Sequence, residues 1–485
     1  MAGITSYGAY VPLHRIERSE FNRAWGGMMA MPGEKAVANF DEDSVSMAVE
    51  ASLDCMNGTD PKTIDGLLFA TTTSPLKERL CASIMATALD LRRDARTSDI
   101  TGTLRAGTTA IATALDAIQA GSMKSVMVAA ADMRTGAPSG DIEQALGDGA
   151  AALLLGDKNV IASIEGSHSV TDDFSGMWRA DGDRFVRLWE DRMILDEGYS
   201  KVLPEAIAGL LKKYNLEPKD FAKVVYDAPH DVRRHPRVAT GLGFDASQIQ
   251  DPMFMTVGNT GTALAMMMLV AALEEAKPGD KILLASYGNG GNAFVLQVTP
   301  EIEKIGARRG IKNNLASKRA VNNYETYLRW RGLVTLEVAR RPERGPTTIA
   351  GLWRDDKVLL GLWGVKCKVC GTPQYTQGGG LGGATPQRIC VECLAKDEFE
   401  DYKFADKKAK VFSFTHDNLA DSPDPPATVN VVDFEGGGRG VFDMTDRDPD
   451  DVHVGMPVEM TFRRLFADPA RGIHNYFWKT RPIRC

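Results

Sequence analysis

Short apolar runs alternate with stretches of small, helix-forming residues over the first 300 positions of the chain. Such runs are typical of buried strands, and the intervening Ala-rich stretches are typical of helices. The runs lie at 66–73, 124–132, 151–157, 223–229, 281–288 and 293–299. Strands interleaved with helices predict an α/β layered fold for this region.

This α/β region contains one succession of elements twice. Each copy has a small-residue helix, a Gly-containing turn, a strand, a Gly-containing loop and a second strand. The elements lie at 107–115, 125–131 and 150–155 in the first copy and at 261–273, 281–286 and 293–298 in the second. We therefore expect two similar α/β halves, 1–165 and 166–300, packed around buried Ala-rich helices. Two ordinary α/β segments with a chance likeness are the alternative.

The chain changes character after residue 300. The centre of residues 301–345 is basic and has a helical pattern. Tyr324, Leu328 and Arg331 share one face there at helical spacing. The Pro- and Arg-rich stretch that follows is typical of a linker. Beyond it, alternating apolar and polar positions with Gly-rich turns predict a small all-β barrel or sandwich. The expected divisions are a helical linker (301–346), a Cys-containing module (347–400) and a barrel (401–485).

The composition excludes several classes of protein. The 485 residues are 44% hydrophobic and 25% charged, and the net charge of -7 argues against a general nucleic-acid binder. No apolar stretch is long enough to span a membrane, and the N-terminus lacks a signal-peptide pattern. Seven cysteines, of which Cys55, Cys81 and Cys485 are scattered, are too few for a secreted disulfide scaffold. We therefore expect a protein of the reducing cytoplasm.

The other four cysteines are spaced as two knuckles. Cys367 and Cys370 form one C-x2-C pair, and Cys390 and Cys393 form a second pair after nineteen intervening residues. Two such tight turns supply four thiolates in tetrahedral geometry, which suits zinc, and four protein ligands leave no open coordination position. We therefore expect one structural zinc. A redox dithiol pair or an iron site are the alternatives.

Several segments of residues 1–300 carry a specific resemblance to a known family. They are ITSYGAYVP (4–12), DITGTLRAGTTA (99–110), GDGAAALLLGD (147–157), YDAPH (226–230), VGNTGTA (257–263) and YGNGGNAFVLQV (287–298). In these segments the chain resembles the thiolase superfamily, within it the hydroxymethylglutaryl-CoA synthase and ketoacyl synthase III branch. Residues 347–485 resemble the OB-fold module with a zinc ribbon that accompanies thiolase-like proteins, here fused to the enzyme domain. The resemblance implies a duplicated five-layer fold, a coenzyme A ester as substrate, and a homodimer.

The catalytic positions of this family are only partly kept. Its members place a nucleophilic cysteine at the N-terminus of the first buried helix, where the helix dipole stabilises a thiolate. The matching position is Leu104, which cannot be acylated. The family's histidine matches Asp227, and the asparagine three residues later matches His230. The asparagine of the Gly-Asn-Thr loop matches Asn259 and is intact, whereas the family's glutamate acid matches Thr72.

These departures leave two interpretations. In the first, Asp227 and His230 are a general base and acid for proton transfer beside a thioester carbonyl. Asn259 and the backbone N–H groups of 288–291 then bind an enolate or oxyanion. In the second, the domain is a non-catalytic acyl-CoA scaffold of a thiolase complex, Asp227 is a helix N-cap and His230 is a surface residue. The intact Asn259 loop and the fused module favour an enzyme. Cys81, in the helical run 80–89, is expected to be a core thiol.

Basic segments offer sites for the phosphates of coenzyme A. Arg233 and Arg234 begin the segment RRHPR and are the CoA-binding candidates, while a solvated face fits the same pattern. A second candidate set consists of Lys318, Arg319, Arg329 and Arg331. The Gly-rich stretches 378–383 and 436–438 lack a following Lys-Ser/Thr, so neither is a phosphate-binding loop.

The function that the sequence favours is an acyl-CoA enzyme that makes or breaks a C–C bond next to the thioester. The step is of the aldol, retro-aldol or Claisen type and uses no cysteine acyl-enzyme. Cysteine-less relatives paired with zinc-ribbon OB modules resemble aldolases of acyl-CoA side chains, and the module is expected to cover the acyl-CoA entrance. A nucleic-acid binder is disfavoured by the acidic balance and by the lack of interleaved aromatic and basic residues on the β segments.

Overall fold

A nine-stranded mixed sheet forms the centre of the enzyme domain. In the computed structural model, residues 2–26, 30–174, 176–337, 348–375, 387–468 and 471–484 are described. The sheet order is β5-β4-β6-β7-β1-β8-β11-β10-β9. Its strands are β1 (Gly3–Tyr10), β4 (Gly66–Ala70), β5 (Arg96–Ile100), β6 (Ser125–Asp132), β7 (Gly149–Gly156), β8 (Ala162–Thr171), β9 (Lys223–Tyr226), β10 (Lys281–Tyr287) and β11 (Gly290–Val298).

The sheet consists of two similar halves. In each half a buried helix, α4 (Ala106–Gln119) or α9 (Leu264–Glu275), leads into an antiparallel pair, β6 with β7 or β10 with β11. Each pair continues into a parallel neighbour, β4 or β9. The halves join where Gly3 and Ile4 of β1 pair with Ser163 and Ala162 of β8. The expected duplicated α/β fold is confirmed.

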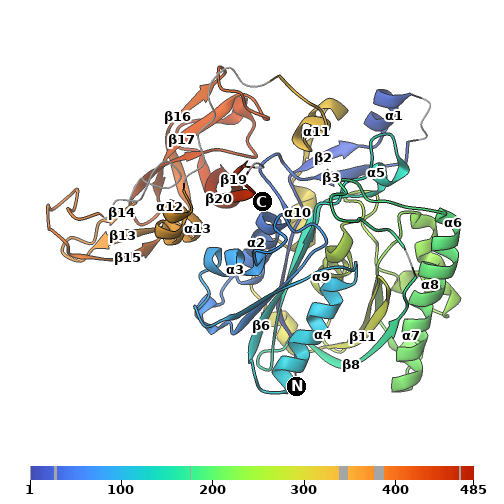
Figure 1. Cartoon of the computed structure of the whole chain (residues 1–485). Coiled ribbons are helices and arrows are strands. Elements are labelled where there is room, and N and C mark those ends of the chain that lie inside the picture. Colours follow the sequence, from blue (N-terminus) through green and yellow to red (C-terminus); the bar gives the residue numbers. More distant parts are fainter. Residues whose placement is uncertain are drawn as a thin grey trace.

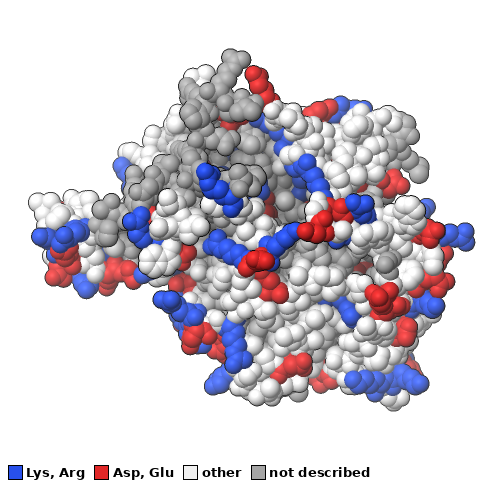
Figure 2. Space-filling view, in the orientation of Figure 1, with Lys and Arg blue, Asp and Glu red and all other residues white. Residues whose placement is uncertain are grey.

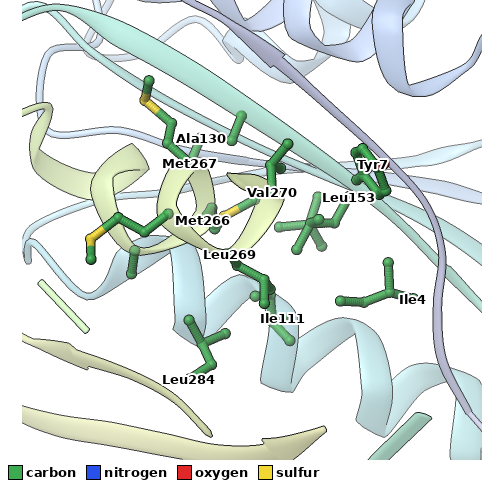
Figure 3. Close-up of a cluster of buried hydrophobic side chains, with 14 of the residues drawn as sticks. Ile4, Tyr7, Ile111, Ala130, Leu153, Met266, Met267, Leu269, Val270 and Leu284 are labelled. Atoms are coloured by element: carbon green, nitrogen blue, oxygen red, sulfur yellow. The ribbon is translucent and has the colours of Figure 1, made fainter. Parts of the chain in front are cut away.

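Helices α4 and α9 pack in the centre of the domain because their facing residues are small or apolar. Every residue of α9 from Leu264 to Val270 is buried. Figure 3 shows Ile111 of α4 close to Leu269 of α9, with Leu153 of β7 and Leu284 of β10 in the same cluster. A Cβ on Gly107 would lie 2.6 Å from the carbonyl oxygen of Thr262, so only glycine permits this approach of the two helix starts.

Further helices cover the sheet and hold the loops at its edges (Figure 1). They are α1 (Ser19–Trp25), α2 (Ser44–Cys55), α3 (Cys81–Ala88), α5 (Asp141–Ala145), α6 (Asp191–Met193), α7 (Ser200–Tyr214) and α8 (His235–Gly241). Beside the main sheet lies a smaller one, β12-β2-β3, built from β2 (His14–Glu17), β3 (Glu34–Val37) and β12 (Arg319–Ala320).

The stretch expected as a helical linker is part of the enzyme domain as far as residue 337. It contains α10 (Gly310–Ala316) and α11 (Tyr324–Trp330). The Asn314 side chain donates to the carbonyl of Ala9 at 3.1 Å, and Tyr324 is buried. The helical content agrees with the expectation, but these packed surfaces are those of a domain layer. The Pro- and Arg-rich end lies almost wholly outside the described residues.

The C-terminal module begins with two short helices, α12 (Ile349–Arg354) and α13 (Asp356–Gly361), where continuous β structure was expected. Leu359 and Leu360 of α13 belong to one buried cluster with residues of α3 and β20, and this burial explains the helix. A three-stranded ribbon follows, with β13 (Trp363–Cys367), β14 (Pro373–Gln374) and β15 (Phe399–Lys403).

The OB-fold sheet has the order β18-β17-β16-β19-β20. Its strands are β16 (Ala409–Asp417), β17 (Ala427–Phe434), β18 (Arg439–Asp443), β19 (Pro457–Asp468) and β20 (Ile473–Pro482). A bridge between Met444, just after β18, and Thr480 of β20 brings the two sheet edges together, as in a barrel. Residues 436–438 form a turn between strands, as expected, whereas 378–383 lie outside the described residues.

The module packs against α2 and α3 of the enzyme domain (Figure 1), and the interface also contains a buried ionic network. Arg463 on β19 is fully buried, and its guanidinium lies 2.7 Å from Glu42 and 3.4 Å from Asp41 of the enzyme domain, and 2.6 Å from Asp446 of the module. Further buried contacts across the interface are Arg481–Glu50, Lys479–Asp41 and Tyr476–Asp43. Buried charges that satisfy one another in this way hold the two parts in one orientation.

Charges of both signs lie on the surface. On the face seen in Figure 2, Lys and Arg are interspersed with Asp and Glu over both parts of the molecule. Within the described part of the chain, no helix is both long and apolar enough to cross a membrane.

Candidate active site

The start of helix α4 defines one wall of the site. Leu104 lies two residues before the helix and is partly buried. A Cβ on Gly288 would lie 2.9 Å from the backbone nitrogen of Leu104 and 2.8 Å from that of Arg105. The Thr103 hydroxyl donates to the carbonyl of Gly288 at 2.8 Å. The loop after β10 is therefore held directly against the position where the family's nucleophile is expected.

Asp227 follows β9 and is 9% exposed. Its Oδ2 accepts a hydrogen bond from the backbone amide of Tyr287 at 3.0 Å, and the carboxylate also accepts one from the amide of Ala265 at the start of α9. Burial outweighs these two hydrogen bonds and raises the pKa of Asp227 to about 7. Asp231, and not Asp227, caps the next turn of the chain. A carboxyl group that titrates near neutral pH is suited to accept and return a proton.

Asn259 ties the Asp227 segment to the Gly-Asn-Thr loop. Its Nδ2 donates to the carbonyl of Ala228 at 2.8 Å, and its Oδ1 accepts from the amide of Gly261 at 2.9 Å. An amide nitrogen has two N–H groups, and among the described residues only one of these two has a partner. Asn259, Asp227 and Leu104 are thus joined through Ala228, Tyr287 and Gly288 into one region.

His230 faces a different partner. Its Nε2 lies 2.5 Å from Oδ1 of Asp191 on α6, and the imidazole is 7% exposed. Asp191 itself is half exposed. In the described ranges no hydrogen bond joins His230 to Asp227. His230 therefore lies close to Asp227 in sequence, but its ring pairs with a different carboxylate, that of Asp191 in the segment before α7.

Threonines replace the expected acid in the loop after β4. The carboxylate of Asp132, at the end of β6, accepts hydrogen bonds from the hydroxyls of Thr71, Thr72 and Thr73, each at 3.0 Å. It also accepts from the amides of Thr72 at 2.7 Å and Thr262 at 2.9 Å. The Thr72 position therefore has no acid of its own, and Asp132 holds this loop against the start of α9.

Two tyrosines enclose the Asp227 side of the site. The hydroxyl of buried Tyr199 donates to the carbonyl of Asp227 at 2.8 Å, and its ring meets that of Tyr287 edge-on with 5.8 Å between centroids. Sequence reasoning missed Tyr199 and Asp132. Asp132 had a signal, since it is the polar end of an apolar strand, whereas Tyr199 lies in no motif.

The proposed coenzyme A arginines already have protein partners. Arg233 is exposed and pairs with Asp231 at 2.7 Å, and Arg234 pairs with Asp196. In the second candidate set, Arg331 is buried in an ion pair with Asp148 and is unavailable to a ligand. Its other members pair with carboxylates as well: Lys318 with Glu34, Arg319 with Asp448 and Arg329 with Asp421.

The described cysteines outside the C-terminal cluster are core thiols. Cys81 is fully buried, and burial raises the pKa of its thiol to about 11. Burial likewise raises the pKa of the Cys55 thiol to about 12. Neither thiol is ionised at neutral pH, as expected for Cys81, so neither replaces the absent nucleophile. Cys485 lies outside the described residues.

The four spaced cysteines come together in the ribbon. The sulfurs of Cys367, Cys370, Cys390 and Cys393 all lie within 4.8 Å of one another. The sulfur separations are 3.7 Å for Cys367 and Cys393 and 3.5 Å for Cys370 and Cys390. Tetrahedral Zn–S bonds of about 2.3 Å require separations of about 3.8 Å, so these residues fit a zinc ion.

Comparison with characterised sequences gives the family. The chain is 32% identical over 337 residues to the hydroxymethylglutaryl-CoA synthase of Methanopyrus kandleri, which covers 67% of this chain and 95% of the relative. It is 33% identical over 349 residues to the hydroxymethylglutaryl-CoA synthase of Pyrobaculum arsenaticum, which covers 69% and 99%. The chain belongs to the hydroxymethylglutaryl-CoA synthase family.

Solved structures have the same thiolase-like fold as this synthase-family domain. The curacin-pathway HMG synthase in complex with acetyl donor-ACP has a TM-score of 0.60 at 20% identity, over 68% of this chain and 88% of that chain. The 3-oxoacyl-[acyl-carrier-protein] synthase III of Aquifex aeolicus has a TM-score of 0.53 at 20% identity, over 61% and 100%. Residues 402–463 match the model of the C-terminal OB-fold domain of ChsH2. The family domain therefore ends before an additional OB-fold module.

Proposed function

We propose that the protein is an acyl-CoA enzyme that makes or breaks a C–C bond next to the thioester without a cysteine acyl-enzyme. Membership of the hydroxymethylglutaryl-CoA synthase family supports the substrate class and the type of bond. The observation that carries the proposal is Asp227, a buried carboxyl group whose pKa is raised to about 7, close to the loop that contacts Leu104. A synthase site with its nucleophile and acid replaced keeps one group suited to proton transfer.

In the bond-breaking direction the substrate is a 3-hydroxyacyl-CoA ester. Asp227 accepts the proton of the 3-hydroxyl, the bond between C2 and C3 breaks, and the electron pair forms the thioester enolate. The spare N–H of Asn259 and a backbone N–H near Gly288 stabilise the enolate oxygen. C3 leaves as an aldehyde or ketone, and C2 takes a proton. The aldol direction is the reverse: C2 loses its proton, the enolate attacks the carbonyl carbon, and Asp227 returns its proton to the new 3-hydroxyl.

His230 is assigned the second proton transfer. Its ring is held by Asp191, as a carboxylate holds the imidazole of a general acid in one orientation. Arg233 and Arg234 remain the candidates for the coenzyme A phosphates, and a phosphate there competes with Asp231 and Asp196.

The second candidate function is a non-catalytic acyl-CoA scaffold within a thiolase complex. The replacement of four family positions, by Leu104, Thr72, Asp227 and His230, favours it. Against it stands the environment of Asp227, because a buried carboxyl group that titrates near neutral pH costs stability and has no ion-pair partner among the groups that set its pKa.

The C-terminal module carries a structural zinc in its Cys₄ cluster and lies beside the site loop. Tyr476 of the module donates to Asp43 at 2.7 Å, and the next residue, Ser44, donates to the carbonyl of Thr73 at 2.8 Å. This short path supports a module that borders the acyl-CoA entrance. The homodimer is supported by β5, one of the two edge strands of the nine-stranded sheet, whose residues are partly exposed.

A mass-spectrometric assay on a panel of 3-hydroxyacyl- and 3-oxoacyl-CoA esters tests the catalytic proposal. Cleavage of at least one ester by the wild-type protein, lost in Asp227→Asn with ester binding kept, is the expected result. Tight binding of the esters with no turnover of any would establish the scaffold instead.

A further inference from the structure

A second polar feature lies beside the site and is not used by the proton-transfer chemistry. Arg134 comes two residues after β6 and is 5% exposed. Its Nη1 has no hydrogen-bond partner among the residues that the structure describes, and its Nη2 contacts only the sulfur of Met177, at 3.6 Å. A thioether is a weak acceptor, so the guanidinium is buried with its strong donors unused.

The nearest carboxylate does not satisfy this arginine. Asp132 lies two residues before Arg134, but its two oxygens already accept five hydrogen bonds from threonine hydroxyls and backbone amides. No hydrogen bond between Asp132 and Arg134 occurs in the described ranges. The carboxylate acts on Arg134 through charge, and the buried Nη1 keeps no hydrogen-bond partner.

A second arginine approaches the first. Arg179 comes from the segment between β8 and α6, is partly buried, and donates from Nη2 to the carbonyl of Thr72. Burial, with repulsion from Arg179, lowers the pKa of Arg134 to about 10 against the opposing effect of Asp132. Two guanidinium groups therefore lie near one carboxylate whose oxygens are already engaged.

The pair lies next to the residues assigned to the chemistry. A Cβ on Gly261 would lie 2.8 Å from Cδ of Arg134, and the amide of Gly261 donates to Asn259. The stem of Arg134 therefore crosses the backbone just beyond Asn259, and Arg179 holds the Thr72 loop. Within coenzyme A esters, the acyl group is the part that reaches the reacting centre, while the long pantetheine arm keeps the phosphates away from it.

The geometry points to an anion subsite in which Arg134 and Arg179 bind a carboxylate on the acyl group of the substrate, an inference that rests on the proposed acyl-CoA function. A planar guanidinium fork matches a carboxylate in charge and geometry. Burying a charged donor without a partner costs free energy, and a bound carboxylate would remove that cost. The substrates would then be acyl-CoA esters of dicarboxylic acids.

Matched ligands of one chain length test the subsite. Equilibrium binding of glutaryl-CoA and pentanoyl-CoA, which differ at the far end of the acyl chain, is measured by calorimetry on the full-length protein. We expect the wild type to prefer glutaryl-CoA by at least about tenfold. Arg134→Met should abolish this preference and leave the affinity for pentanoyl-CoA unchanged. Equal affinity of the wild type for both esters would overturn the inference.

Two controls distinguish the subsite from a general effect of charge and from a coenzyme A phosphate site. Arg93→Met removes an exposed arginine before β5, at the opposite end of the parallel strands, and should keep the preference. The 3′-dephospho forms of both esters distinguish the source of the anion. If Arg134→Met weakens both full esters equally and neither dephospho ester, the arginine binds a coenzyme A phosphate and the inference is wrong.

Folding and catalysis are also separable in this experiment. If Arg134→Met fails to give a wild-type circular dichroism spectrum, Arg179→Met, at a partly exposed position, should reduce the same preference, and an unchanged preference would contradict the subsite. Binding requires no turnover. A protein that cleaves no ester but prefers glutaryl-CoA would therefore refute the catalytic proposal and leave the subsite in place.

Discussion

The carboxylate of Asp227 accepts a hydrogen bond from the backbone amide of Tyr287, with 3.0 Å between Oδ2 and the nitrogen. Tyr287 ends β10, and the next residue, Gly288, lies against the backbone of Leu104. One hydrogen bond thus links the residue at the family's histidine position to the loop beside its nucleophile position. This link is the geometric basis for the proposed proton transfer at a site whose nucleophile position holds Leu104.

The first prediction concerns pH. Asp227 acts as a base only when it is deprotonated, and burial raises its pKa to about 7. Below that value kcat/KM for proton abstraction should fall about tenfold per pH unit, and above it the rate should level off. Asp227→Asn should lose at least about 100-fold in kcat/KM, and its kcat/KM should not show this fall at acidic pH. A wild-type profile that is flat between about pH 5 and about pH 8 would exclude Asp227 as the base.

Leu104 offers a gain-of-function test. A cysteine at this position stands at the start of α4, where the helix N-terminus favours a thiolate. Leu104→Cys, incubated with acetyl-CoA, should gain the mass of one acetyl group, and peptide mapping should place it in the segment before α4. The wild type, with its described thiols outside the zinc cluster buried, is the control and should gain none. An unmodified variant would put the positional match to the family's nucleophile in doubt.

The interface charge network predicts strong coupling between the module and the enzyme domain. Arg463→Met leaves Asp41, Glu42 and Asp446 buried without their shared cation. We expect a loss of about 3–5 kcal/mol in the free energy of unfolding, measured by urea denaturation. Arg439→Met, which breaks a half-exposed pair with Asp433 on the same module, should cost less than about 1 kcal/mol. Equal effects of the two substitutions would contradict the network's role.

The four cysteines of the ribbon are expected to bind zinc, and the buried thiols of the enzyme domain are not. Metal analysis of the purified protein should find about one zinc per chain. Cys390→Ser should lose the metal. The ribbon should then become sensitive to proteolysis, because no zinc ion links the two C-x2-C turns. Cys81→Ala, which removes a buried thiol of the enzyme domain, should keep the full zinc content. Iron in place of zinc, or a disulfide between the pairs, would refute the assignment.

Local patterns predicted the parts of the structure that local forces determine. The periods of apolar residues located the strands and the two buried helices, and the C-x2-C spacing located the cluster. The domain role of residues 301–337 was missed, because the two-residue strand β12 and the buried face at Tyr324 exist only through contacts with β2 and α1. A linker and a packed layer have the same local pattern.

The site shows the same limit. Asp227 and Asn259 were found through motifs, but their hydrogen-bond partners were not. Tyr199 and the segment that holds Asp132 and Arg134 lie far apart in sequence, and folding alone brings them to one region with Asp227 and Asn259. The position of His230 against Asp191 depends on a segment whose sequence has no signature. Motif spacing therefore identifies candidates, while their roles depend on tertiary contacts.

We propose that C–C bond chemistry beside a thioester proceeds in this protein without an acyl-enzyme. The most direct measurement is mass spectrometry of ligand and intact protein in the same reaction with a 3-hydroxyacyl-CoA ester that the protein turns over. We expect a shortened acyl-CoA and a carbonyl product, with the protein mass unchanged throughout turnover. An acyl adduct on the protein during turnover, or the absence of any product from every ester in the panel, would contradict it.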